Sequence, residues 1–252
     1  MSKNRLKLNL DKTEFIWLGS KHNLGKVHID TIQLGSCSIK VAATVRNVGV
    51  IFDNEMNLNA QVSSVVRSCF YQLRQLRSIQ RFLTTDAIKT LVHAFVCSRV
   101  DYCNSVLLES TGRNYEKLQS ILNAAARLIV GRRKFDHICD VLQGLHWLRV
   151  PQRCQFKVAC VTRRCLLGTG PDYLASYLVP VSTVSARSHL RSAARGNLVV
   201  PKHRTKTARR SFMYTGPTTW NDLPREIRDL NNCDTNFISS LKTHLFAKSF
   251  NL

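Results

Sequence analysis

The residues of this sequence best suited to chemistry are arginines spaced for contact with phosphate groups. Arg67, Arg74 and Arg81 lie seven residues apart, and Arg77 lies between the last two. On a helix this spacing places the four guanidinium groups along one side, with no aspartate or glutamate interleaved to form the usual ion pairs. A purely cationic stripe favours contact with nucleic-acid phosphates, although an ordinary solvated face has the same spacing.

A second cationic segment lies between Asp172 and Asp222, which enclose a stretch without any acidic residue. Its basic residues are Arg187, Arg191, Arg195, Lys202, Arg204, Lys206, Arg209 and Arg210. The whole chain has the same bias, since 37 Lys and Arg residues oppose 16 Asp and Glu residues and the net charge is +21. A compact protein with this charge repels itself unless a polyanion accompanies it, so nucleic acid is the first partner to expect.

Residues for metal-dependent catalysis do not stand out. A nucleotidyl transferase holds two divalent ions with closely placed carboxylates, and the sequence has no Asp-Asp pair or comparable acidic cluster. It also has no G-x-x-x-x-G-K-[ST] loop and no G-x-S-x-G elbow. The spacing of Cys154, Cys160 and Cys165 does not suit a tetrahedral zinc ion. The sequence therefore predicts no catalytic residues, no metal site and no bound cofactor.

The composition predicts a folded protein outside the secretory pathway. Of the 252 residues 44% are apolar, which is enough to build a core. No apolar run approaches the roughly 20 residues of a membrane-spanning helix, and no signal peptide is recognisable at the N-terminus. Nine scattered cysteines suit reduced thiols. We expect a nuclear or cytoplasmic protein that is not secreted and has no membrane partner and no small-molecule substrate.

The apolar pattern that must position the arginines predicts a mainly α fold with a small β part, an α+β protein. Short strands are expected at residues 27–33, 37–41 and 45–52. A long amphipathic helix over residues 58–83 carries the arginine stripe. Four more helices are expected: one begins at Thr84, one ends at Gly131, one begins at Pro151 and one lies near the C-terminus. Strand-like pieces are expected at residues 197–200 and 210–214. Natural boundaries lie near residues 57 and 180.

Longer strings of the sequence resemble reverse transcriptases, which are RNA-directed DNA polymerases. The similar enzymes are those of non-LTR retrotransposons, transposable elements of the LINE type that include the jockey-like elements. NRLKLNLDKTEFIWLGS at residues 4–20 and VRNVGVIFD at residues 45–53 are similar to the end of the polymerase palm. Four later strings of the chain resemble, in the same order, the blocks that follow the palm in these polymerases: RSCFYQLRQLRSIQRFLT, TLVHAFVCSRVDYCNSVLL, KLQSILNAAARLIVG and GPTTWNDLPREIR. The likeness covers essentially the whole chain.

This resemblance implies three parts. Residues 1–57 match a palm remnant with a lysine motif and a primer-grip-like hairpin, residues 58–180 match the helical thumb and following helices, and residues 181–252 match a basic C-terminal region with a terminal helix. Lys12 matches the family's lysine, which is thought to assist the departing pyrophosphate. Met1 matches an internal position of the family's polyprotein.

The family's two metal-binding elements are missing from the matched segment. Its Tyr/Phe-x-Asp-Asp loop and earlier metal-binding Asp, which hold Mg²⁺, precede the block that matches the start of this chain. The resemblance therefore implies a truncated polymerase that is no enzyme by itself but keeps sequence-independent binding to RNA or an RNA/DNA template-primer. Two alternatives are a polymerase completed by acids of another chain and a domesticated, non-enzymatic protein-interaction adapter. The aromatic residues Phe70, Tyr71, Trp147 and Trp220 are expected in the core rather than as stacking platforms.

Overall fold

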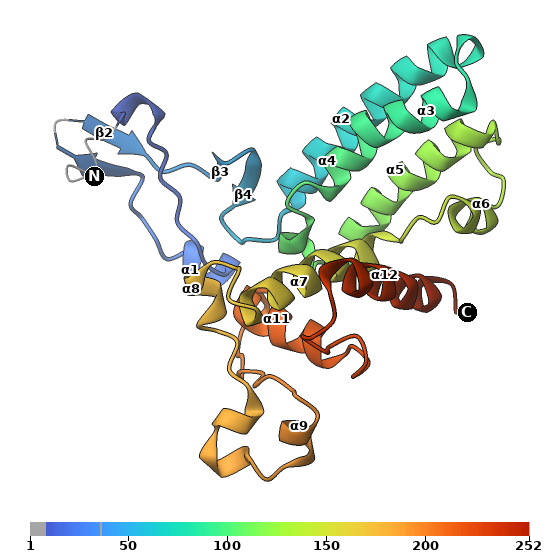
Figure 1. Ribbon diagram of the computed structural model, residues 1–252. Helices are drawn as coiled ribbons and strands as arrows, with labels where there is room; N and C mark the ends of the chain where they lie inside the picture. The colour runs from blue at the N-terminus through green and yellow to red at the C-terminus, as the bar shows by residue number, and fades with distance from the viewer. Residues whose placement is uncertain (1–8, 36, 252) are drawn as a thin grey trace. The chain divides into compact units, whose positions relative to one another are not determined.

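The computed structural model describes residues 9–35 and 37–251 (Figure 1). It is mainly helical with a small β part, which confirms this coarse fold class. The chain divides into two compact units between Ser64 and Val65, inside the long helix α2 (Asn59–Ile79). The three-part division at residues 57 and 180 stays a prediction.

The first unit contains the β part as two separate hairpins. Short helical turns precede them, and the strands pair antiparallel in sequence order: η2 (Leu10–Lys12), α1 (Lys21–Leu24), β1 (Thr31–Leu34) with β2 (Cys37–Lys40), and β3 (Thr44–Asn47) with β4 (Val50–Asp53). The first strand begins at Thr31 and not at residue 27 as predicted. The reason is local, because the amides of Lys26 and Val27 donate to carbonyls at the end of α1 and not to a neighbouring strand.

The turn between β3 and β4 contains a strained residue. Its central residues Val48 and Gly49 have φ angles of 46° and 79°, as a type I′ hairpin turn requires. Glycine adopts such an angle freely, but a β-branched residue does so only at a cost. Val48 is also 78% exposed, so its side chain gains little from packing.

Replacing Val48 with asparagine is therefore expected to stabilise the hairpin by about 1 kcal/mol, because asparagine tolerates the left-handed region. Urea unfolding and hydrogen exchange of the β4 amides would measure this gain. Val48→Ile keeps the β-branch and serves as the control. An asparagine variant no more stable than the isoleucine variant would show that the turn stores no strain.

The second unit begins with helices that surround a common apolar core. In chain order they are α2, η3 (Gln80–Phe82), α3 (Thr85–Val92), η4 (His93–Cys97), α4 (Ser98–Asp101), η5 (Asn104–Leu107) and α5 (Gly112–Val130). Leu73 and Leu76 of α2 are buried, as the helical spacing predicts. The hydroxyl of Thr84 accepts from the amide of Ala87 and caps α3, which packs against α5 (Figure 1). Gly131, with φ 71°, ends α5 where the sequence predicts.

The rest of this unit is organised around α7. The elements are α6 (Cys139–Gly144), α7 (Val150–Leu166), α8 (Asp172–Ala175), η6 (Val181–Thr183), η7 (Ser185–Arg187), α9 (Arg191–Ala194), α10 (Lys206–Arg210), α11 (Phe212–Asn221) and α12 (Asp234–Phe250). Pro151 lies in the first turn of α7, where its missing amide costs no hydrogen bond. Helices α11 and α12 both pack on α7, and their core contains Trp220, Phe237 and Leu241 (Figure 1).

Two of the strand predictions were wrong. Residues 210–214 belong to α10 and α11, which are separated by the extended residue Ser211. The hydroxyl of Thr205 caps α10, and burial of α11 against α7 outweighs the low helix propensity of Gly216 and Pro217. Residues 197–200 form only an isolated antiparallel bridge, between Pro180 and Leu198.

Candidate nucleic-acid interface

A cavity of about 590 Å³ opens between α2 and the end of α5, within the second unit. Its apolar lining residues include Phe70, Leu73 and Leu128. Six cationic residues line it, and none of the described residues in its wall is acidic: Arg74, Arg77, Arg127, Arg132, Arg133 and Lys134. A second hollow shares Arg77, Gln80 and Gly131 with this cavity and adds Arg81. We call the first cavity, with its six cationic residues, the basic cavity.

Two local features bring the walls of the basic cavity together. The side-chain amide of Gln80, just after α2, donates to the carbonyl of Leu128 in α5 at 2.8 Å. The left-handed backbone of Gly131 then reverses the chain, and the amide of Arg132 bonds to the carbonyl of Arg127 at 3.0 Å. Residues 131–134 therefore line the same cavity as the exposed arginines of α2.

Two of the six cationic side chains already bond to other residues of the chain. Arg132 forms a two-pronged ion pair with Asp140, with N–O distances of 2.8 and 2.5 Å, and this contact holds the pKa of the Asp140 carboxyl below its usual value. Arg127 donates to the carbonyl of Asp136 at 2.9 Å, while its Nε is buried without a hydrogen-bond partner among the described residues.

The other four cations have no ion pair among the residues that the structure describes: Arg74, Arg77, Arg133 and Lys134. All four are exposed. Neighbouring positive charges repel each other, so an anion that enters the basic cavity gains Coulomb energy and relieves this repulsion. Guanidinium groups also match the paired oxygens of a phosphate.

The structure brings together only part of the predicted stripe. Arg74 and Arg77 line the basic cavity, and Arg81 lines the adjoining hollow. Arg67 is exposed on α2 but lines neither. Helix α2 ends at Ile79, so Arg81 lies in the tighter turn η3 and its guanidinium rests 4.7 Å from the centroid of the Phe82 ring.

The remaining predicted contacts lie elsewhere. Lys12 is exposed in η2 of the first unit, and Arg191 is exposed in α9. Arg209 pairs with Glu109 at 3.1 Å, so part of its charge is already neutralised. Arg210 ends α10, and Arg187 belongs to η7. Lys12, Arg191, Arg209 and Arg210 do not line the basic cavity.

No family model, curated protein or solved structure matches this chain. Four residues of the basic cavity were not among the sequence-based candidates: Arg127, Arg132, Arg133 and Lys134. The signal for three of them was the GRRK string at residues 131–134, a cationic run directly after a helix-ending glycine.

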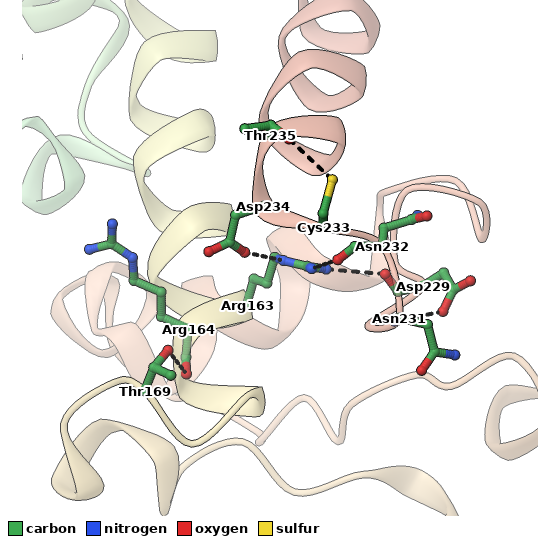
Figure 2. Close-up of polar contacts among 9 residues, drawn as sticks. All are labelled: Arg163, Arg164, Thr169, Asp229, Asn231, Asn232, Cys233, Asp234 and Thr235. Carbon is green, nitrogen blue, oxygen red and sulfur yellow. Dashed lines mark hydrogen bonds and ion pairs between the residues drawn. The ribbon is translucent and has the colours of Figure 1, made fainter.

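A further arginine, Arg163 in α7, has a structural role (Figure 2). Its side chain is 3% exposed, and its nitrogens contact the segment before α12 and the first residue of that helix. Nε pairs with Asp234 at 3.2 Å, and the terminal nitrogens donate to the carbonyls of Asp229, at 3.1 Å, and Asn232. The guanidinium also lies 4.6 Å from the ring centroid of Phe237. Because this side chain is enclosed and three of its N–H groups are engaged within the chain, it is not accessible to a phosphate.

The cysteines of α7 are also part of the core. Cys154 and Cys165 are buried, and Cys160 is half-buried. Burial raises the pKa of the Cys154 thiol to about 12, so it stays a neutral thiol at physiological pH. Across residues 9–35 and 37–251 no group of three or more His, Cys, Asp or Glu could hold a metal ion. Over the same residues no helix has the length and apolarity that crossing a membrane demands.

Proposed function

We propose that this chain binds RNA or an RNA/DNA duplex through the sugar-phosphate backbone, without sequence preference. The observation that carries the proposal is the basic cavity, where four of six cations make neither an ion pair nor a side-chain hydrogen bond among the described residues. Contacts to phosphate fix a protein on nucleic acid but read no sequence, so they suit a general binder. The resemblance to the end of the palm and the thumb of non-LTR reverse transcriptases supports the same ligand, a template-primer.

The salt dependence of binding tests this proposal. Each phosphate contact on duplex nucleic acid contributes about −0.9 to the slope of log affinity against log salt concentration. Four contacts by the unpaired cations therefore predict a slope of roughly −3 to −4. Fluorescence anisotropy with labelled RNA/DNA duplexes of two unrelated sequences would measure it. A flat slope, or an affinity that depends strongly on sequence, would contradict backbone binding and favour the protein-interaction adapter.

A second expectation follows from the absent carboxylate pair. The purified chain should incorporate no nucleotides on a primed RNA template with either magnesium or manganese, because nothing in the sequence matches a two-metal site. Primer extension on a denaturing gel would measure incorporation. A mock purification controls for contaminating polymerases, and templated extension above that background would show that the chain has a catalytic site of its own.

A further inference from the structure

Two phenylalanines beside the basic cavity are exposed to solvent. Phe135 is 89% exposed and Phe82 is 73% exposed. Aromatic rings in water lose the free energy that burial provides, so exposed rings beside a cavity mark a binding surface. Each ring directly follows a cation of the two hollows, since Arg81 precedes Phe82 and Lys134 precedes Phe135.

Both rings are held on segments that the fold joins. Phe82 belongs to η3, where Gln80 bonds to the end of α5, and Phe135 follows the chain reversal at Gly131. A cation lies over each ring, with Arg81 Cζ at 4.7 Å from the centroid of one and Lys134 Nζ at 5.2 Å from that of the other. Each exposed ring therefore lies next to a cation that lines one of the two hollows.

A third aromatic ring extends this surface inward. Phe70 is half-buried and lines the basic cavity together with Leu73. Tyr71 was predicted in the core but is exposed on α2, whereas Trp147 and Trp220 are buried as predicted. The cavity volume of about 590 Å³ lies in the range of sites that enclose small organic ligands.

Cations interleaved with exposed rings suit unpaired nucleotides. The bases of a duplex already stack on each other, so a duplex offers these rings no free aromatic face, whereas every unpaired base has one. We propose that Phe82 and Phe135 stack unpaired bases of single-stranded RNA or DNA while Arg74, Arg77 and Arg133 hold the adjacent phosphates. This inference rests on the proposed function and specifies its ligand as a single-stranded segment.

The surface favours nucleic acid over the other polyanion that attracts aromatic and cationic side chains, an anionic membrane. A protein that lies on a membrane usually does so along an amphipathic helix with one apolar face. Here Phe82 lies in a three-residue turn and Phe135 in a loop, and the cations line a concave cavity rather than a flat face. A phosphate chain can enter such a cavity, but a bilayer surface cannot.

The test compares the full chain with the double variant Phe82→Ala and Phe135→Ala on matched probes. The probes are a 12-nucleotide single-stranded DNA, the same strand without bases, and a blunt duplex. Alanine replacement of a stacking ring costs roughly 5- to 150-fold in affinity per base. The variant should therefore bind the single strand at least tenfold more weakly and the duplex within about twofold. Wild-type protein should prefer the strand with bases to the abasic strand by a similar factor.

Controls separate stacking from folding and charge. The pair Phe82→Trp and Phe135→Trp keeps a stacking surface and should keep the affinity for the single strand. Tyr173 and Tyr177 are exposed aromatics that do not line the basic cavity, and replacing both with alanine should change nothing. Circular dichroism of each variant checks that its helices are intact.

The outcomes distinguish the two proposals. Equal, salt-dependent binding of the strands with and without bases, unaffected by the alanine pair, would overturn stacking but leave backbone binding intact. Binding to none of the probes at any salt concentration would overturn both. Binding to phosphatidylserine vesicles that is lost in the alanine pair, without a loss on single strands, would assign the rings to a membrane surface instead.

Discussion

Replacing Arg163 with methionine is expected to lower the free energy of unfolding of the helical unit by about 2–4 kcal/mol, because two carbonyls lose their buried donor. The carbonyls belong to Asp229 and Asn232, and the segment between them is held to α7 through this side chain (Figure 2). The third partner matters less. The side chain of Asp234 is 73% exposed, so water solvates its charge once the arginine is gone.

The neighbouring residue provides the matched control. Arg164 is exposed, and Arg164→Met removes the same charge and adds the same side chain, with an expected change within about 0.5 kcal/mol. Urea unfolding followed by circular dichroism would compare the two variants. Equal urea midpoints for the two variants would mean that the contacts of Arg163 with the segment before α12 contribute nothing to stability.

Local sequence patterns predict the helices of this protein well. The spacing of Leu73 and Leu76 gives the buried side of α2, and the glycine at 131 and the proline at 151 mark helix ends because their backbones allow few alternatives. Arg74 and Arg77 could be chosen as candidates for the same reason, since their three-residue spacing places them next to each other on one side of that helix.

The rest of the candidate site could not be predicted because it depends on contacts between distant segments. The hydrogen bond from Gln80 to Leu128 joins residues that lie 48 positions apart, and it closes the basic cavity. From the sequence alone, Arg133 and Lys134 are only charged residues in a loop after a helix. Burial is equally non-local, as Arg163 looks like one more surface cation of a basic chain, yet it is enclosed by the segment before α12.

Removal of two charges from the basic cavity is expected to have the largest effect on binding. Replacing Arg74 and Arg77 with glutamine should reduce the slope of log affinity against log salt concentration on duplex by up to about two units. At 0.1 M monovalent salt this corresponds to a loss of up to roughly 60-fold in affinity, because each contact contributes nearly a factor of ten there. The loss should shrink as the salt concentration approaches 1 M. Fluorescence anisotropy at several salt concentrations measures both quantities.

The same double change should leave the fold intact, and this separates binding from stability. Glutamine has nearly the helix propensity of arginine, and both arginines are exposed without an ion pair among the described residues. Arg113 and Arg225 are exposed arginines that do not line the cavity and do not belong to the predicted stripe, so their replacement with glutamine removes the same net charge elsewhere. An equal loss in both double variants would assign binding to the overall charge of the chain. A loss confined to the first variant would assign it to the basic cavity, where the protein concentrates positive charge that it does not itself neutralise.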